Sequence, residues 1–311
     1  MTLLEAKGLS IVFPTSRGEV KAVDQVDISL GEREFVGIAG ESGAGKSTLA
    51  LGMLRLLTPP GKVVAGEVLF HGTDILKLTD EQFRKDYRWT KLAMVFQGSM
   101  NGFTPVFTIG SQLKEVLALH GREASDSTIS KLLETVDLDN SIASRYPHEL
   151  SGGQKQRAFI AMALSLEPEV LVTDEPTTAL DVITQATIIN LLKRLRKELG
   201  ISVLLITHDL ALISEAVERL YVMYAGGVVE EGPSIDFFAK PKHPYSQGLL
   251  TSTPTLTSNE IKGIPGFLPD LANLPPGCRF TPRCPFAMEV CKRDYPPLKG
   301  VGGERVACWL Y

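Results

Sequence analysis

The chain has 311 residues, of which 44% are hydrophobic and 22% are charged, enough for one large domain with an appendage or for two modest domains. Its 32 basic and 36 acidic residues give a net charge of −4, which argues against the basic surface that holds a protein to nucleic acid. The sequence contains no stretch of about 18 apolar residues, and MTLLEAKGLS lacks the basic and apolar pattern expected of a secretory signal. We therefore expect a cytosolic chain that meets a membrane only through a partner.

The first third of the chain alternates short apolar and polar runs. Three of these runs read LLEAKGLSIVF, VKAVDQVDISL and GEVLFHG, and Gly, Pro and Ser residues separate them. This pattern predicts antiparallel strands. Another run, EFVGIAG, is apolar without alternation and leads into a glycine-rich loop and then the segment KSTLALGMLRLL. That order predicts a strand, a loop and a helix.

The middle of the chain changes character. Residues from about 98 to 165 show helical patterning without a strong strand, which indicates a helical subdomain inserted into an α/β core. Next, PEVLVTDE and ISVLLITHD predict buried strands on either side of a helix that ends at Gly200, so the sheet should be parallel.

Near the end of the chain, Gly226 and Gly227 predict a hairpin turn. Pro and Gly then become frequent after about residue 240. We therefore expect two parts, residues 1–240 and a C-terminal extension, residues 241–311.

The stretch GESGAGKST fits the pattern G-x-x-x-x-G-K-[ST] between a predicted strand and a predicted helix. In such a loop, glycines let backbone N–H groups surround phosphate oxygens, the lysine reaches the outer phosphates, and the serine hydroxyl can bind Mg²⁺. The residues predicted to bind the nucleotide here are Gly40, Glu41, Ser42, Gly43, Ala44, Gly45, Lys46, Ser47 and Thr48.

Two further motifs carry residues that can take part in phosphate binding and hydrolysis. The strand VLVTDE ends in Asp174, which can hold Mg²⁺, and Glu175, which can polarise an attacking water. The stretch LSGGQKQR places Ser151 and two glycines where a helix should begin, and a helix N-terminus attracts anions. Two phosphate sites in one chain indicate a head-to-tail pair of chains, each completing the nucleotide site of the other.

These motifs make residues 1 to about 240 resemble the nucleotide-binding subunit of an ATP-binding cassette (ABC) transporter. The resemblance implies an α/β P-loop NTPase fold with a RecA-like core, an antiparallel β subdomain and an inserted helical subdomain. It also implies ATP as the substrate, with Ser47, Gln97 and Asp174 holding Mg²⁺. The other matching positions are Phe13 against adenine, Gln97 in the Q-loop, Ser151, Gly152, Gly153 and Gln154 in the signature, Asp181 in the D-loop and His208 as the switch histidine.

The resemblance assigns catalytic roles to Lys46, Gln97, Glu175 and His208. Each of the single positions also has a plainer interpretation. Phe13 can be core of the β subdomain, His208 can be structural, and Gln97 can cap a strand. After Gln97 the chain reads GSMNGFTPVF, whereas relatives in the peptide branch usually have Asp-Pro. That departure leaves the transported substrate open.

The C-terminal extension contains all four cysteines. Its stretches KHPYSQGLL, IPGFLPDL and PPGCRFTPRCPFAMEVC resemble the extension of the oligopeptide and dipeptide importer branch. The resemblance implies a four-iron, four-sulfur (4Fe–4S) cluster on Cys278, Cys284, Cys291 and Cys308. Five, six and sixteen residues separate successive cysteines, without the C-x₂-C pairs of common zinc ribbons and ferredoxin-like clusters. Spacing alone therefore leaves iron–sulfur, zinc, and free thiols or disulfides open.

Together these features predict the ATPase subunit of a membrane importer for dipeptides or oligopeptides, peripheral on the cytoplasmic face of the cell membrane. The expected partners are transmembrane permease subunits, a second cassette that is a paralogue or a copy, and, indirectly, an extracytoplasmic substrate-binding protein. No nucleic acid partner is expected. The alternatives are an importer of oligosaccharides or nickel, a soluble ABC ATPase acting on DNA or the ribosome, and an interaction protein with a relic nucleotide site.

Overall fold

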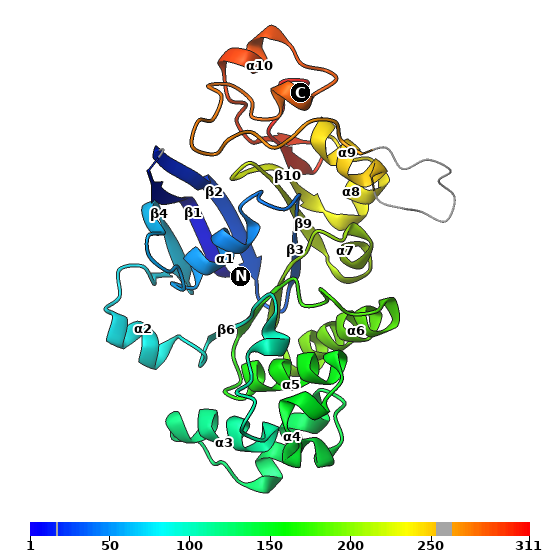
Figure 1. Cartoon of the computed structure of the whole chain (residues 1–311). Helices are drawn as coiled ribbons and strands as arrows, with labels where there is room; N and C mark the ends of the chain where they lie inside the picture. The colour runs from blue at the N-terminus through cyan, green and yellow to red at the C-terminus, as the bar shows by residue number, and fades with distance from the viewer. Residues whose placement is uncertain (17, 253–262) are drawn as a thin grey trace. The chain divides into compact units, whose positions relative to one another are not determined.

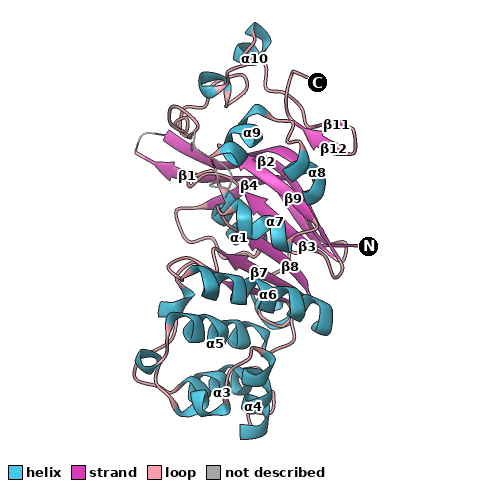
Figure 2. Ribbon diagram, turned by 90° about the vertical axis from the view of Figure 1, so that its right-hand side faces the viewer, coloured by secondary structure: helices cyan, strands magenta, loops and turns pink. Residues whose placement is uncertain are grey.

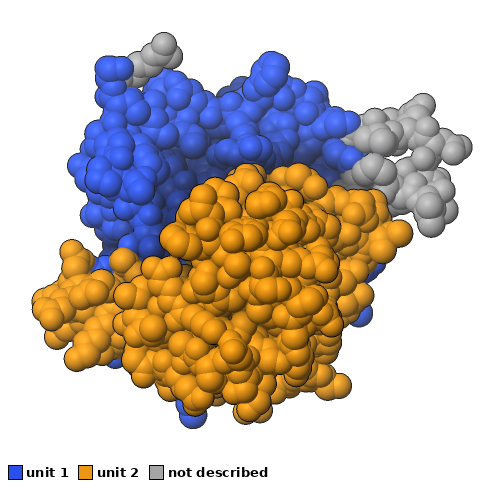
Figure 3. Space-filling view, turned by 60° about the horizontal axis from the view of Figure 1, so that its bottom comes forward, with its two compact units in different colours: residues 1–31, 35–77, 206–311 blue, residues 32–34, 78–205 orange. Residues whose placement is uncertain are grey.

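The computed structural model describes residues 1–16, 18–252 and 263–311, which form two compact units. Unit 1 consists of residues 1–31, 35–77 and 206–311, and unit 2 consists of residues 32–34 and 78–205. Figure 3 shows the two units in different colours, and Figure 1 follows the chain through its helices and strands. The units are defined by compactness, so the predicted domains 1–240 and 241–311, and the helical subdomain 98–165, stay predictions.

The antiparallel sheet of unit 1 matches the alternating runs of the first third of the chain. Its strands lie in the order β2-β1-β4-β5 and pair antiparallel throughout. Buried apolar residues of β1, such as Leu4, Leu9 and Ile11, line its core face. The bounds are β1 Thr2–Thr15, β2 Gly18–Gly31, β4 Lys62–Phe70 and β5 Thr73–Asp74.

A second group of strands in unit 1 lies in the order β11-β12-β10-β9-β3. All five residues of β3 are buried, as expected from its unbroken apolar run, and β3 pairs parallel with β9. The C-terminal extension contributes β12, which pairs antiparallel with β10. The bounds are β3 Phe35–Ala39, β9 Arg219–Tyr224, β10 Gly227–Pro233, β11 Lys299–Val301 and β12 Glu304–Val306.

The hairpin between β9 and β10 turns one residue earlier than predicted. Ala225 and Gly226 have positive φ angles of 47° and 82°, whereas Gly227 is already the first residue of β10. A Cβ atom on Gly227 would lie 2.6 Å from the hydroxyl of Tyr295. Gly227 is therefore explained by close packing against the extension, and the turn itself uses Ala225.

Among its described residues, six helical segments complete unit 1. They are α1 Lys46–Met53, α7 Leu210–Ala216, α8 Ser234–Ala239, α9 Pro244–Thr251, η4 Thr281–Arg283 and α10 Glu289–Arg293. A cluster of rings from Tyr224, Tyr245 and Phe280 is fully buried among β9, α9 and the extension. The extension therefore has an apolar anchor on the rest of unit 1.

Unit 2 combines buried strands with a helical region. Strand β6 pairs parallel with β7, and β8, most of which lies in this unit, is the next strand along. From residue 98 to 165 the chain is helical without a strand, as predicted, and α3, α4 and α5 pack on one another (Figure 2). The bounds are β6 Leu92–Val95, β7 Val170–Asp174, β8 Ser202–Ile206, α2 Asp80–Asp86, η1 Ser99–Asn101, α3 Ile109–Leu119, α4 Asp126–Thr135, η2 Asn140–Ser144, η3 Pro147–Glu149, α5 Gly152–Leu164 and α6 Val182–Leu199.

Helix α6 ends as the sequence predicts. Gly200 adopts the left-handed conformation at φ 69° and donates its N–H to the carbonyl of Arg196, the usual glycine stop of a helix. Its buried stripe includes Ile188, Leu192 and Leu195. The predicted end of this helix at Gly200 is therefore confirmed.

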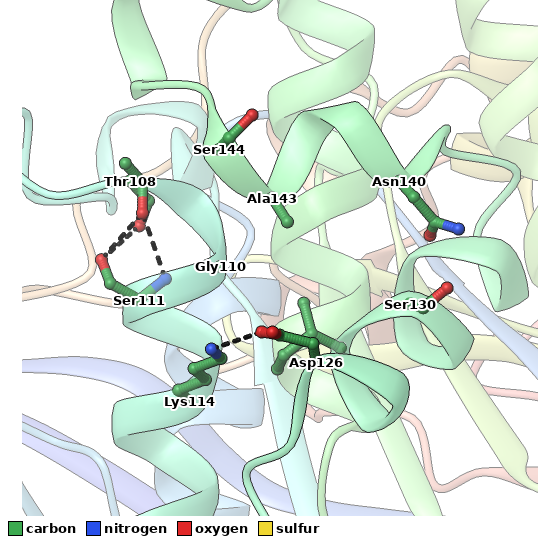
Figure 4. Close-up of a pocket in the computed structure, with 10 residues that line it drawn as sticks. Thr108, Gly110, Ser111, Lys114, Asp126, Ser130, Asn140, Ala143 and Ser144 are labelled. Atoms are coloured by element: carbon green, nitrogen blue, oxygen red, sulfur yellow. Dashed lines mark hydrogen bonds and ion pairs between the residues drawn. The ribbon is translucent and has the colours of Figure 1, made fainter.

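A pocket of about 530 Å³ lies among α3, α4 and η2 in unit 2 (Figure 4). Lys114 of α3 and Asp126 of α4 form an ion pair of 2.5 Å at its wall. Thr108 accepts a hydrogen bond from the backbone N–H of Ser111 and caps α3. None of the predicted nucleotide, catalytic or metal residues lines this pocket.

Candidate active site

The loop after β3 has a backbone that only glycine allows at its two ends. Gly40 and Gly45 have φ angles of 148° and 102°. A Cβ atom on either would lie 2.3 Å from a backbone oxygen, that of Met223 for Gly40 and that of Ala22 for Gly45. Because no side chain fits there, the loop can lie flat against β9 and β2. The sequence pattern of glycines is thereby explained by close backbone packing.

Lys46 opens α1 and is almost fully buried. Its Nζ donates hydrogen bonds to the backbone carbonyls of Gly40 at 2.8 Å and Glu41 at 2.9 Å. A buried ammonium needs such acceptors, because it has lost its hydration. The two bonds hold the positive charge of Lys46 beside the backbone of the loop.

The start of α1 lacks a capping side chain, because its N-cap residue is Gly45. Ser47 and Thr48 lie in the first turn, where backbone N–H groups point toward the loop. A helix N-terminus next to a buried lysine attracts anions. Residues 40–48 therefore form a cradle whose shape and charge fit the phosphates of a nucleotide.

Phe13 and His208 also belong to unit 1. Phe13 lies in β1 and is half-buried, and its ring leaves so little room that a Cβ atom on Gly61 would lie 2.6 Å from Cε1. His208 is exposed between β8 and α7, just before Asp209, which caps α7 by accepting from the N–H of Ala211. Their predicted roles toward adenine and γ-phosphate stay predictions.

In unit 2 the structure brings Gln97 and Glu175 together. Nε2 of Gln97 donates to Oε2 of Glu175 at 2.8 Å, and Oγ1 of Thr178 donates to the same oxygen at 3.0 Å. Asp174 is the last residue of β7 and is 4% exposed. Gln97 is therefore a hydrogen-bond partner of Glu175, and Thr178 is a second partner that the sequence motifs did not indicate.

Ser151 caps α5 through a reciprocal pair of hydrogen bonds. Its hydroxyl accepts from the N–H of Gln154, and the side chain of Gln154 accepts from the N–H of Ser151 at 2.9 Å. This capping box fixes the helix start. Gly153 faces Thr184 so closely that a Cβ atom would lie 2.6 Å from its methyl group.

Asp181 caps α6 beside this segment. Its carboxylate accepts hydrogen bonds from the N–H of Thr184 at 3.0 Å and from the hydroxyl of Thr184 at 2.6 Å. These bonds hold the pKa of Asp181 below its usual value. The predicted signature and D-loop residues of unit 2 are thus linked through Thr184, which sequence reasoning missed.

The four cysteines all lie in the described part of the extension, as free thiols. The N–H of Cys278 donates to the carbonyl of Cys291 at 2.8 Å. Burial raises the pKa of Cys278, Cys284 and Cys308, and the neighbouring cysteines raise it further. Within the described ranges, however, no three His, Cys, Asp or Glu side chains are arranged to hold a metal ion. As placed, the thiols do not form the predicted cluster site.

Comparison with known families gives two matches. The family model "ABC transporter" matches residues 23–178, and "Oligopeptide/dipeptide transporter, C-terminal region" matches residues 229–291. The second match includes Cys278, Cys284 and Cys291 and ends before Cys308. In the described part of the chain, the helices are all too short or too polar to cross a membrane.

Individual proteins resemble the whole chain. A Brucella abortus (strain 2308) protein named as a peptide import ATP-binding protein is 45% identical over 98% of this chain and 94% of its own length. The dipeptide transport ATP-binding protein DppD of Haemophilus influenzae is 42% identical over 99% of this chain and 95% of its own.

Solved structures resemble about three quarters of the chain. A dimeric ATP-binding cassette in a post-hydrolysis state with ADP and Pi matches with a TM-score of 0.66 and 31% identity, covering 75% of this chain and 99% of the cassette. The protein cbiO1 of Clostridium perfringens, part of the ABC transporter complex cbiONQ, matches with a TM-score of 0.67 and 27% identity, covering 77% of this chain and 91% of cbiO1. The predicted α/β P-loop fold is confirmed.

Proposed function

The chain belongs to the ABC transporter family, and we propose that it is the ATP-hydrolysing subunit of a membrane importer of dipeptides or oligopeptides. The phosphate cradle at residues 40–48 is the observation that carries the ATPase assignment. The match of residues 229–291 to the oligopeptide/dipeptide transporter region supports the peptide class. The relatives named for peptide import and dipeptide transport align over nearly their full length and support it as well.

The reaction is in-line attack of water on the γ-phosphorus of ATP, which breaks the bond to the bridging oxygen and gives ADP and phosphate. The cradle holds the phosphate oxygens through backbone N–H groups, and Lys46 places a positive charge beside them. Glu175, oriented by Gln97 and Thr178, polarises the water. His208 donates a hydrogen bond to the γ-phosphate.

The three residues that we assign to Mg²⁺ carry oxygen atoms of the kind that this ion binds. Ser47 and Gln97 offer neutral oxygens, and Asp174 offers a carboxylate at the end of β7, the hard oxygen ligands that Mg²⁺ prefers. When bound with ATP, Mg²⁺ neutralises charge on the phosphate oxygens. Lys46 would hold the phosphates of the nucleotide, and Glu175 would orient the attacking water.

We assign a second anion-binding role to Ser151 to Gln154, because they lie at the start of α5, and a helix N-terminus attracts anions. We assign this segment to the nucleotide of the partner cassette, which is a paralogue or a second copy of this chain. Phe13 stacks on adenine, and Asp181 lies at the interface of the pair. Closure and reopening drive the permease subunits on the cytoplasmic face of the membrane. An extracytoplasmic binding protein delivers the substrate.

We also propose that the extension carries a 4Fe–4S cluster on Cys278, Cys284, Cys291 and Cys308. The support is the resemblance of the extension, together with the pKa of Cys308, which burial and the other three cysteines raise. The described arrangement is not a metal site, so cluster binding requires these side chains to rearrange. We assign the cluster a structural role, and no step of ATP hydrolysis uses it.

Transport by intact cells tests the function. Cells that carry Glu175→Gln in place of the wild-type chain should lose uptake of labelled dipeptides or oligopeptides while the variant stays with the membrane fraction. Lys46→Ala should lose both ATP binding and uptake. Loss of nickel or oligosaccharide uptake with normal peptide uptake would overturn the peptide class. Recovery of the chain with ribosomes or DNA would overturn the importer assignment.

A further inference from the structure

Three groups from different parts of unit 1 hold Glu41, the residue after the first glycine of the phosphate loop. Its carboxylate accepts from Nη1 of Arg283 at 2.7 Å and from Nη2 at 2.9 Å. Its backbone N–H donates to the hydroxyl of Tyr245 at 2.8 Å. Its carbonyl accepts from Nζ of Lys46 at 2.9 Å. Glu41 therefore joins the C-terminal extension to the lysine of the nucleotide site.

Hydrogen bonds fix the side chain of Arg283 in one orientation. Its side chain is 4% exposed. Besides the two bonds to Glu41, Nε donates to the carbonyl of Pro265 at 2.9 Å, Nη2 donates to that of Ile264 at 3.2 Å, and Nη1 lies 3.4 Å from the hydroxyl of Tyr224. A guanidinium has five N–H donors in a fixed planar fork. All five have an acceptor within the protein, so the fork that meets Glu41 is held in one orientation.

Tyr245 is held just as firmly. Its side chain is fully buried, and its ring lies 4.6 Å from that of Tyr224 and 5.4 Å from that of Phe280, centroid to centroid. Burial raises the pKa of its hydroxyl, which stays protonated and can accept from Glu41 with a lone pair. The acceptor for the Glu41 N–H is therefore a rigid part of the core.

Two more contacts connect the extension to this loop and its surroundings. A Cβ atom on Gly43, at the tip of the loop, would lie 3.6 Å from Cδ1 of Leu268. The N–H of Lys21, in the neighbouring β2, donates to the carbonyl of Leu271 at 3.0 Å. The extension thus approaches the loop at Gly43 as well as at Glu41, where Arg283 and Tyr245 make the polar contacts.

We propose that Arg283 and Tyr245 are positioning residues of the ATP site, which hold the phosphate loop through Glu41 in the shape that binds nucleotide. This inference rests on the proposed ATPase function and assigns part of the nucleotide site to the extension. A loop that occupies its binding shape only part of the time loses affinity in proportion to that fraction. Loss of the contacts from Arg283 and Tyr245 to Glu41 therefore weakens ATP binding more than it slows hydrolysis, because bound ATP itself orders the loop.

The test compares Glu41→Gln, Arg283→Gln and the double variant with wild type. We expect each single variant to raise the Kd for a fluorescent ATP analogue, and the KM for ATP, about tenfold, with kcat within about twofold. The double variant should resemble the singles, because all three lack the same ion pair. Tyr245→Phe, which removes only the hydroxyl, should raise Kd about threefold. Arg283→Lys should recover part of the loss, since it keeps the charge but not the fork.

Arg305→Gln is the matched control. Arg305 also lies in the extension and pairs with Glu231 of β10 at 3.1 Å, but it is half-exposed and its partner is not a residue of the loop. It should leave Kd, KM and kcat unchanged.

Two results would overturn the proposal: a Kd for Glu41→Gln within twofold of wild type, or a fall in kcat at unchanged KM. The Glu41 variant decides even where Arg283→Gln unfolds, because Glu41 is partly exposed. Wild-type protein that binds no ATP would instead overturn the proposed function itself.

Discussion

Nε2 of Gln97 lies 2.8 Å from Oε2 of Glu175 and donates a hydrogen bond to it. The same oxygen accepts from Oγ1 of Thr178 at 3.0 Å. Glu175 itself has a φ of 45°, which is unusual for a residue with a side chain. The carboxylate of Glu175 is therefore held from two sides of the sequence. Gln97 precedes the helical region, and Thr178 follows β7. Such positioning is what a base needs to aim at one water molecule.

Glu175→Gln should lower kcat for ATP hydrolysis by at least about 100-fold and leave the Kd for ATP unchanged. The amide can still meet Gln97 and Thr178 after a side-chain flip, but it cannot take a proton from water. Steady-state hydrolysis together with equilibrium binding of a fluorescent ATP analogue separates the two effects. Thr178→Val, which removes one of the two orienting bonds, should show a smaller fall in kcat. Equal hydrolysis by Glu175→Gln and wild type would rule out this base.

Ser151→Ala should have two separable consequences. It removes the hydroxyl that caps α5 and should cost about 1 kcal/mol in the free energy of unfolding. It also removes part of the segment that we assign to the partner's nucleotide, so ATPase activity should fall further than the stability change explains.

Ser125→Ala is the matched control for that effect. Ser125 caps α4 by accepting from the N–H of Thr128 at 3.3 Å, as the Ser151 hydroxyl accepts from Gln154, and it lies outside the signature. Urea unfolding should give a similar loss for both variants, whereas only Ser151→Ala should lose activity. Equal activity of the two variants would contradict the role assigned to the signature.

Gly45→Ala should abolish ATP binding. The new Cβ atom would meet the carbonyl oxygen of Ala22 at 2.3 Å, at a φ of 102° that alanine rarely adopts. Since both atoms belong to the backbone, either the loop or β2 must move. Gly72→Ala separates the strain of a positive φ from the clash, because Gly72 has a φ of 77° with nothing within 4 Å of the added atom. It should cost about 1–2 kcal/mol in stability and keep ATP binding, as calorimetry and a binding titration can check.

The elements of the fold followed from local patterns, because alternation and unbroken apolar runs report which faces are buried. Gly200 stops α6 as predicted, since a left-handed residue is a local requirement. Gly227 differs: its reason is the distant Tyr295, so the turn was placed one residue late. Arg283 shows the same limit at the site. Nothing around it in sequence indicates that it meets Glu41, 242 residues earlier.

The cluster proposal predicts iron and acid-labile sulfide, each near four per chain, in protein purified without oxygen, with an absorption band that is lost on air oxidation. Cys284→Ser should lose most of both, because thiolate ligands hold such clusters. Zinc without sulfide would replace the cluster by a zinc site. Free thiols with no metal would agree with the described arrangement and overturn the proposal.

His243 should make the protein sensitive to mild acid. It is 1% exposed, its Nδ1 accepts from the N–H of Tyr245 at 3.0 Å, and burial lowers its pKa to about 3. The unfolded chain binds a proton at this histidine below about pH 6.5, whereas the folded chain does not until about pH 3. Stability is therefore complete above about pH 6.5 and falls as the pH drops, by up to about 1.4 kcal/mol per unit.

His243→Asn should flatten this slope, because an asparagine oxygen can accept from the N–H of Tyr245 without titrating. The difference between variant and wild type, from urea unfolding between pH 5 and pH 6.5, removes the effect of Glu230. Burial raises the pKa of that carboxyl, and it is present in both proteins. His148→Asn, at an exposed histidine of unit 2, is the control and should keep the wild-type slope. Parallel stability curves for His243→Asn and wild type would show that His243 is not the group that titrates on unfolding.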